Sequence, residues 1–226
     1  MQNKVSFQIT KTQIQIAGIT TVDDAIMCAQ KGCDIIGLLV GQQHTSTEFI
    51  SRDFAKEIKL ALPSHTKTTL ITHLEDANTI IKDAKYIDVD YIQLHSNIKE
   101  SEVAKIRSAL PNKKLIRVIH ISQDAKILTD LSKIKYADFY ITDSINLKTD
   151  QVGGTGLVHD YNIDKQLVQT LNKPVFVAGG LTSQNVSEVI KLCKPYGVDV
   201  NSGCRGKNGH RDPQKVTQFV KNVKNA

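Results

Sequence analysis

Short apolar runs alternate with segments of helical periodicity eight times along this chain, and that alternation limits the folds open to it. The run Cys33–Val40 is continuously apolar, as expected for a strand buried on both faces of a sheet. Thr21–Lys31, just before it, carries apolar residues at helical spacing. Strands that alternate with helices form parallel sheets, because each helix carries the chain back to the start of the next strand. Eight repeats in 226 residues indicate an α/β fold, a single-domain (β/α)8 TIM barrel.

The barrel prediction assigns most of the chain to strands and helices. The predicted strands are Ile14–Ala17, Cys33–Val40, Thr68–Thr72, Tyr91–Leu94, Leu115–Ile119, Phe139–Thr142, Pro174–Ala178 and Gly197–Val200. The predicted helices are Thr21–Lys31, one beginning near Ser51, Asp76–Tyr86, Lys99–Leu110, Ser122–Lys135, Asp164–Leu171, an amphipathic segment between the last two strands, and Asp212–Asn225. Residues 1–12 are predicted to form an N-terminal extension or extra strand, and residues 13–226 the barrel. A doubly wound open sheet is the alternative, but it requires G-x-G-x-x-G after the first strand, where this chain has Ala17-Gly18-Ile19-Thr20.

The amino-acid composition limits the kinds of molecule that this protein is expected to bind. The net charge of +6 is spread along predicted helix faces, and aromatic residues make up only 5% of the chain, which argues against nucleic-acid binding. The sequence shows no signal peptide and no apolar run of membrane-spanning length, so we expect a cytoplasmic protein without a membrane partner. The four cysteines lack metal-ligand spacing, so we predict no metal and no organic cofactor. A monomer and a homodimer are both compatible with the sequence.

Two glycine-containing turns close the last two predicted strands. Gly179-Gly180 follows the first of these strands, and Ser202-Gly203 follows the second. In eight-fold barrels the corresponding loops bind phosphate through backbone N–H groups and a helix N-terminus. We therefore predict phosphate binding at these four residues, and a small-molecule phosphosugar as the substrate.

Polar residues follow several of the other strands, at the end where barrel enzymes place their chemistry. These candidates are His44, Glu48, His73, Gln93, His95, Arg117 and His120. His73, His95 and His120 are each equally well interpreted as polar residues that close the barrel mouth. Asp143 is more informative, because it ends an apolar strand and precedes a loop containing Gly153–Gly156. It is a candidate general acid or base, and its alternative role is to cap that loop.

Taken together, the motifs resemble those of the phosphoribosylanthranilate isomerase family, the barrel enzymes of tryptophan biosynthesis. The motifs are GIT at Gly18–Thr20, QLH at Gln93–His95, Asp143, GGTG at Gly153–Gly156 with Asp160 behind it, AGGLTSQNV at Ala178–Val186, PYGVDVNSG at Pro195–Gly203, and Asp212-Pro213. The resemblance runs from about Gln13 to the C-terminus. It implies an Amadori rearrangement, in which an acid opens the sugar ring and a base removes the proton from C2.

The resemblance also implies roles for individual positions. Asp143 matches the family's acid, while Gln93, His95, Arg117, Gly154 and Gly156 are expected to contact the substrate. The family's base is a cysteine in a K-[IV]-C-G motif, which reads Gln15-Ile16-Ala17-Gly18 here. Alanine cannot accept a proton, and a lost base usually lowers the rate by about 10²- to 10⁴-fold. The family's carboxylate-binding arginine is replaced by Glu48, which is expected to repel that carboxylate.

Three functions follow from these matches and departures. The first is isomerisation of a phosphoribosyl-type substrate other than phosphoribosylanthranilate, with Asp143 as acid or base and a second base among Glu48, His44, His73 and His120. The second is authentic phosphoribosylanthranilate isomerisation with an unusual base. The third is phospho-ligand binding without catalysis. The first is favoured, because the reacting end of the site has changed while the phosphate end has not.

Overall fold

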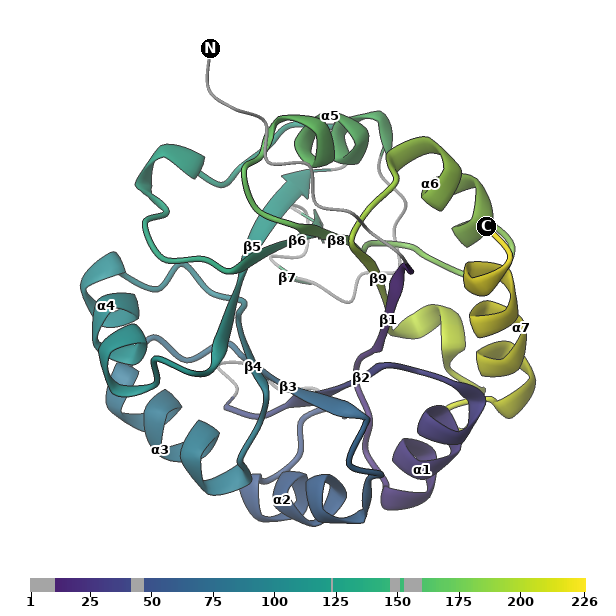
Figure 1. Ribbon diagram of the computed structural model, residues 1–226, viewed down its shortest axis with the longest axis horizontal. Coiled ribbons are helices and arrows are strands. Elements are labelled where there is room, and N and C mark those ends of the chain that lie inside the picture. The colour runs from purple at the N-terminus through teal and green to yellow at the C-terminus, as the bar shows by residue number, and fades with distance from the viewer. Residues whose placement is uncertain (1–10, 42–46, 123, 147–150, 153–159) are drawn as a thin grey trace.

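The computed structural model describes residues 11–41, 47–122, 124–146, 151–152 and 160–226. Figure 1 shows a ring of strands enclosed by a ring of helices, viewed down the barrel. This arrangement confirms the predicted TIM barrel. The predicted N-terminal extension falls almost entirely outside the described residues, as do the whole GGTG loop and His44.

The strands and helices lie close to their predicted positions. The strands are β1 (Gln13–Ile16), β2 (Ile35–Leu39), β3 (Lys67–Thr72), β4 (Tyr91–Leu94), β5 (Lys114–Ser122), β6 (Phe139–Asn146), β7 (Gln151–Val152), β8 (Val175–Val177) and β9 (Gly197–Val200). The α-helices are α1 (Val22–Lys31), α2 (Arg52–Ala61), α3 (Ala77–Ile87), α4 (Glu100–Ala109), α5 (Asn162–Thr170), α6 (Val186–Cys193) and α7 (Pro213–Lys224). Two short 3-10 turns, η1 (Leu131–Lys133) and η2 (Ser202–Cys204), complete the elements in the described part of the chain.

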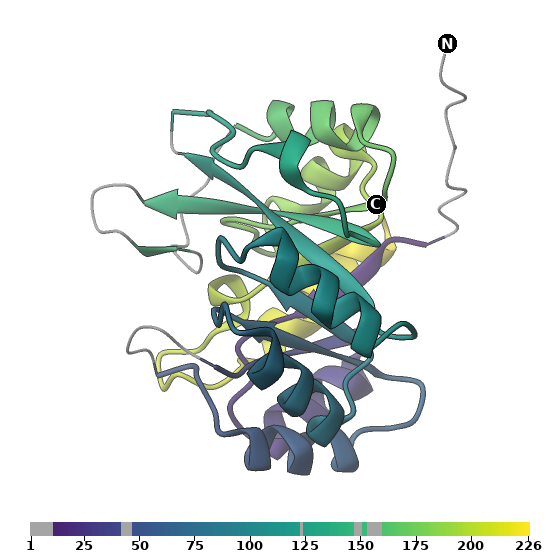
Figure 2. The ribbon, with the colours of Figure 1, turned by 90° about the vertical axis from the view of Figure 1, so that its left-hand side faces the viewer.

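The strands pair in the order β5-β4-β3-β2-β1-β9-β8-β6, and β6 pairs with β5 to close the barrel. These pairings are all parallel, while β7 adds an antiparallel pairing at the far end of β6. Figure 2 shows β6 and β7 projecting beyond the body of the barrel. The outer faces of the strands pack against the helices around buried side chains such as Ile14, Leu38 and Phe219.

Local sequence sets the helix ends. The side chain of Thr21 caps α1 by accepting the amide of Asp24, and Gly32 ends that helix with a φ of 97°. Asp212 caps α7 in the same way, and Pro213 occupies its first turn, where no intrahelical N–H is needed. These caps explain why both predicted helix starts lie within one residue of the observed ones.

The predicted helix Ser122–Lys135 is wrong. Strand β5 continues to Ser122, and the chain then turns back so that the amide of Leu128 donates to the carbonyl of His120 at 2.9 Å. The Ser122 hydroxyl accepts the amide of Lys126 at 3.0 Å, which holds the turn. Only the 3-10 turn η1 follows before β6. A serine side chain that binds nearby backbone competes with helix formation, and this competition outweighs the apolar spacing.

Candidate active site

A chain of hydrogen bonds crosses the barrel interior and ends at Asp143. Thr69 Oγ1 donates to Gln15 Oε1 at 2.8 Å, and Gln15 Nε2 donates to Gln93 Oε1 at 3.1 Å. Gln93 Nε2 lies 3.2 Å from His95 Nδ1, and His95 Nε2 lies 3.0 Å from Asp143 Oδ2. The structure thus brings three of the predicted site residues, Gln93, His95 and Asp143, into one network.

The donor and acceptor roles along these hydrogen bonds determine which groups donate to Asp143. Because Gln93 uses its amide oxygen toward Gln15, its Nε2 donates to His95 Nδ1, and His95 therefore carries its proton on Nε2. His95 then donates to Asp143 Oδ2, while the backbone amide of Ser144 donates to Asp143 Oδ1 at 2.8 Å. Both carboxylate oxygens of Asp143 therefore accept a hydrogen bond.

Three histidine rings lie side by side at this end of the barrel. The ring centroids of His73 and His95 are 5.0 Å apart, and those of His95 and His120 are 5.8 Å apart, both edge to face. Burial, and then the neighbouring His95, lowers the pKa of His120 to about 4, so this imidazole is neutral at pH 7. Within the described residues, no three His, Cys, Asp or Glu side chains are grouped to hold a metal ion.

Asp199 is a second carboxylate at this level, which the sequence reasoning did not single out. It lies on β9 opposite Gln15 of β1, and parallel partners direct their side chains to the same face of the sheet. Its Oδ1 is buried and has no hydrogen-bond partner among the described residues. Burial, and then the charge of Asp143, raises the pKa of Asp199 to about 7. Its position inside the PYGVDVNSG motif, two residues before the predicted phosphate-binding serine, was the available signal.

Ala17, at the position of the family's base, lies in an apolar layer. It packs with Leu39 and Ile71, and Phe49 lies against the same cluster. Gly37 comes so close that a Cβ there would lie 2.9 Å from the Ala17 Cα. His73 borders this cluster, with its ring centroid 5.5 Å from that of Phe49.

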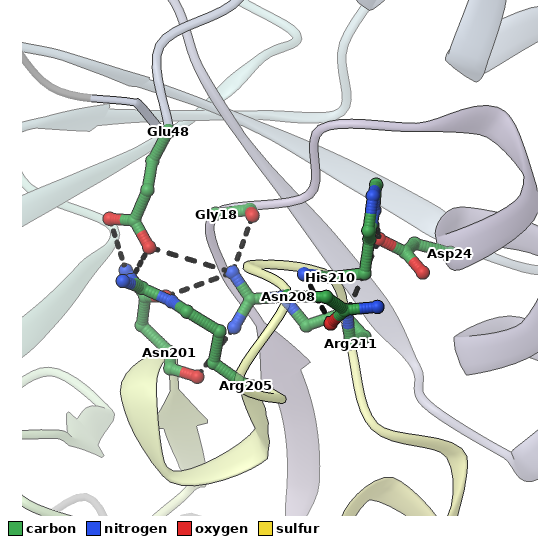
Figure 3. Close-up of polar contacts among 8 residues, drawn as sticks. All are labelled: Gly18, Asp24, Glu48, Asn201, Arg205, Asn208, His210 and Arg211. Atoms are coloured by element: carbon green, nitrogen blue, oxygen red, sulfur yellow. Dashed lines mark hydrogen bonds and ion pairs between the residues drawn. The ribbon is translucent and has the colours of Figure 1, made fainter.

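Glu48 was expected to repel a substrate carboxylate, but two arginines hold its own carboxylate group. Figure 3 shows Glu48 facing Arg205 and Arg211, with Asn201 between them. Glu48 forms an ion pair with Arg205, and its Oε1 lies 3.6 Å from Arg211 Nη2. Asn201 Nδ2 donates to Glu48 Oε2 at 2.9 Å. Two cations around one anion leave a positive local balance.

The structure places Arg117 away from the other candidates. Its guanidinium pairs with Glu100 at 2.5 Å, at the first turn of α4. Its register partners are Leu94 and Tyr140, whose side chains pack in the clusters between barrel and helices. Arg117 therefore lies on the outer face of β5, while His120, three residues on, lies on the inner face. The predicted substrate contacts Gly154 and Gly156 lie outside the described residues.

A cavity of about 340 Å³ opens between the loops after β8 and β9. Its walls include three of the four predicted phosphate-binding residues, Gly180, Ser202 and Gly203. Gly179 and Gly180 have φ values of 87° and 66°, a backbone conformation that glycine adopts without strain. Lys215, from the first turn of α7, adds a cation that the sequence reasoning missed. It also donates to the carbonyl of Arg205 at 2.7 Å.

Comparison with known proteins is consistent with this geometry. The family described as N-(5'phosphoribosyl)anthranilate (PRA) isomerase matches residues 14–222. N-(5'-phosphoribosyl)anthranilate isomerase 2 of Methanosarcina mazei is 38% identical over 94% of this chain and 94% of its own. The isomerase of Aquifex aeolicus is 34% identical over 94% of this chain and 98% of its own.

Solved structures of similar fold bear the same name. N-(5'-phosphoribosyl)anthranilate isomerase from Pyrococcus furiosus has a TM-score of 0.78 at 26% identity, covering 95% of this chain and 100% of that one. The Thermotoga maritima enzyme, at 22% identity and a TM-score of 0.80 over 95% of this chain and 100% of its own, supports the fold alone. None of the helices in the described part of the chain is long and apolar enough to cross a membrane. The chain belongs to the N-(5'-phosphoribosyl)anthranilate isomerase family.

Proposed function

We propose that this protein isomerises N-(5'-phosphoribosyl)anthranilate, the substrate after which its relatives are named. The phosphate of this substrate is bound between the loops after β8 and β9, and Asp143 transfers a proton at the sugar ring. The observation that carries this proposal is the ion pair of Glu48 with Arg205. The sequence favoured a different substrate for two reasons, the loss of the family's base at Ala17 and the expected repulsion by Glu48, and the pairing with Arg205 argues against the second.

Arg205 supplies the cation for the anthranilate carboxylate. Its side chain is 31% exposed, whereas that of Arg211 is 1% exposed and already bound to backbone carbonyls. Arg205 Nε is buried and has no hydrogen-bond partner among the described residues. A guanidinium presents five donors in a planar fork, so Arg205 can pair with Glu48 and still receive a second carboxylate.

The direct test is turnover of phosphoribosylanthranilate by the purified protein, followed as loss of substrate and appearance of the amino-ketose. A phosphoribosyl-aniline, which lacks the carboxylate, is the matched comparison substrate. We expect conversion of the anthranilate compound at a kcat/KM at least tenfold higher. Equal turnover of both compounds would contradict carboxylate recognition, and tight binding of both without turnover would favour a non-catalytic phospho-ligand protein.

Replacement of Arg205 by alanine should raise the KM for phosphoribosylanthranilate by about 10- to 100-fold, as expected for loss of a hydrogen bond between charged groups. The kcat should change less than threefold, because Arg205 does not contact the reacting atoms. Lys207→Ala, an exposed cation two residues further on, is the control and should leave KM unchanged. Glu48→Gln should leave kcat intact, and a large fall in kcat for this variant would restore Glu48 as a candidate base.

Replacement of Gly203 by alanine should weaken phosphate binding at least tenfold. An added Cβ would lie 2.0 Å from the carbonyl oxygen of Leu181, so the loops after β8 and β9 must move apart. Overpacking of this kind also costs about 1–3 kcal/mol of stability. Calorimetric titration with inorganic phosphate measures the first effect. Gly206→Ala is the control, since its nearest contact would be the Asn208 side chain at 3.0 Å.

A further inference from the structure

Asp143 and Asp199 stand on either side of one small residue at the same level of the barrel. The register of β6 with β8 and of β8 with β9, continued by one or two residues, places Asp143 beside Ala178 and Ala178 beside Asp199. Asp143 also lies opposite His120, whose ring contacts His95 on the inner side of the barrel. The two carboxylates therefore face the same interior space, next to the loops that form the phosphate cavity.

The surroundings of the two carboxylates differ in a way that separates their chemistry. Asp143 accepts hydrogen bonds on both of its oxygens, from His95 and from the Ser144 amide. Asp199 Oδ1 is buried without a partner among the described residues, which favours its protonated form. Two carboxyl groups in such different environments can divide the roles of proton donor and proton acceptor between them.

We propose that Asp199 is the general acid of the isomerisation and Asp143 its general base. This assignment rests on the proposed function, and it explains how the chain can dispense with a base at Ala17. It reverses the role that family resemblance gives to Asp143. The base function moves from β1 to β6, and the acid function moves to the neighbouring carboxyl on β9.

The protons balance over the cycle. Asp199 gives its proton to the ring oxygen as the C1–O bond breaks, and the nitrogen lone pair forms the C=N bond of an iminium. Asp143 then takes the proton from C2, and the C–H electrons form C1=C2 while the C=N pair returns to nitrogen. The resulting enolamine tautomerises to the amino-ketose by gaining a proton at C1 and losing one from the C2 hydroxyl. The proton on Asp143 returns to Asp199 through solvent.

The charged groups around Asp199 come from three directions. Asp143 on β6 raises the pKa of Asp199. A hydrogen bond from Gln15 on β1, and then the charges of His95 on β4 and Arg211 before α7, act in the opposite direction with smaller effect. The adjoining strand β8 consists of apolar residues. His120 is a poor alternative acid, because its pKa of about 4 leaves it unprotonated at neutral pH.

The sign of the pH dependence follows from this assignment. Below about pH 7 Asp199 holds its proton and can open the ring, and above that pH the proton is lost. We therefore expect kcat/KM of the wild-type protein to fall about tenfold per pH unit above neutrality. In Asp199→Asn the rate should drop by about 10²-fold, and the fall above pH 7 should disappear. A variant that keeps both the wild-type rate and the wild-type profile would overturn the proposal.

A substrate deuterated at C2 of the ribosyl group tests which carboxylate does which step. Asp199→Asn slows ring opening, so the isotope effect on kcat should fall toward 1. Asp143→Asn slows proton removal from C2, so the isotope effect should approach its full intrinsic value. The opposite pattern would mean that Asp143 is the acid, and the proposal would be wrong.

Asp88→Asn is the matched control, because Asp88 is 78% exposed and ends α3, before the start of β4. It should leave both rate and pH profile unchanged. A wild-type protein that fails to convert phosphoribosylanthranilate would contradict the proposed function rather than this assignment. In that case ¹³C NMR of aspartate carboxyl carbons decides: one group should titrate near pH 7 in the wild type and be missing in Asp199→Asn. Absence of that titration in the wild type would overturn the inference by itself.

Discussion

Replacement of Asp143 by asparagine is expected to lower kcat by about 10²- to 10⁴-fold, the usual cost of losing a positioned proton-transfer group. Asparagine matches aspartate in size but cannot take a proton. Its amide oxygen can accept from His95 or from the Ser144 amide, but its NH₂ group must then face the other donor. The side chain is only 11% exposed, so solvent offers little relief for this mismatch.

Steady-state kinetics with phosphoribosylanthranilate measure this effect, with KM expected to change less than kcat because the phosphate and carboxylate contacts persist. The variant should also shift the pH profile. Since the charge of Asp143 contributes to the raised pKa of Asp199, its removal lowers that pKa, and the fall in rate should move to lower pH. Unchanged turnover would remove Asp143 from the reaction. The Asp88→Asn protein again serves as the control for a lost surface carboxylate.

The barrel was predictable because its signals are local and repeated. Each strand is a short apolar run, and each confirmed helix carries its own apolar spacing, often with a capping side chain such as Thr21 or Asp212. The one wrong helix shows where this reasoning fails. The spacing over residues 122–135 suits a helix, but the Ser122 hydroxyl and the continued pairing of β5 with β6 favour a turn instead.

The site was predictable only where strand position alone decides the outcome. Gln93 and His95 belong to the end of β4 and Asp143 to β6, and they meet because they face inward from the two strands that flank β5. Arg117 and His120 were both proposed, yet they stand three residues apart on one strand and must face opposite sides of the sheet. Strict use of that two-residue period would have excluded Arg117 in advance.

Glu48 could not be interpreted from the sequence, because its meaning depends on residues more than 150 positions away. Its partners Asn201 and Arg205 come from the other end of the chain, and only barrel closure brings them to the loop after β2. Asp199 lies near Asp143 because β8 alone separates their two strands. Long-range pairing of charges therefore decides the chemistry of this site, while local pattern decides its scaffold.

Arg211 is the residue on which that long-range pairing depends, and its replacement by methionine should cost about 3–5 kcal/mol of stability. Its guanidinium is 1% exposed and donates to the carbonyls of Gly18 and Asn201 while it also faces Glu48. Methionine fills much of the same volume but leaves these acceptors without their donor. Urea unfolding measures the loss, and thermal unfolding should show a melting temperature lower by about 6–20 °C.

Arg52→Met is the control, because its ion pair with Asp83 is 3.5 Å long and its side chain is 40% exposed, so that pair contributes less than about 1 kcal/mol. The double variant Arg211→Met, Glu48→Gln should lose less stability than the sum of the two single variants. Each single variant leaves one buried charge without its partner, and the double variant removes both charges. A loss below about 1 kcal/mol for Arg211→Met would contradict this interpretation. Arg211 is held by backbone carbonyls, so Arg205 is the guanidinium that can turn toward a substrate. In the proposed function Arg205 therefore recognises the substrate carboxylate, while Arg211 stabilises the fold.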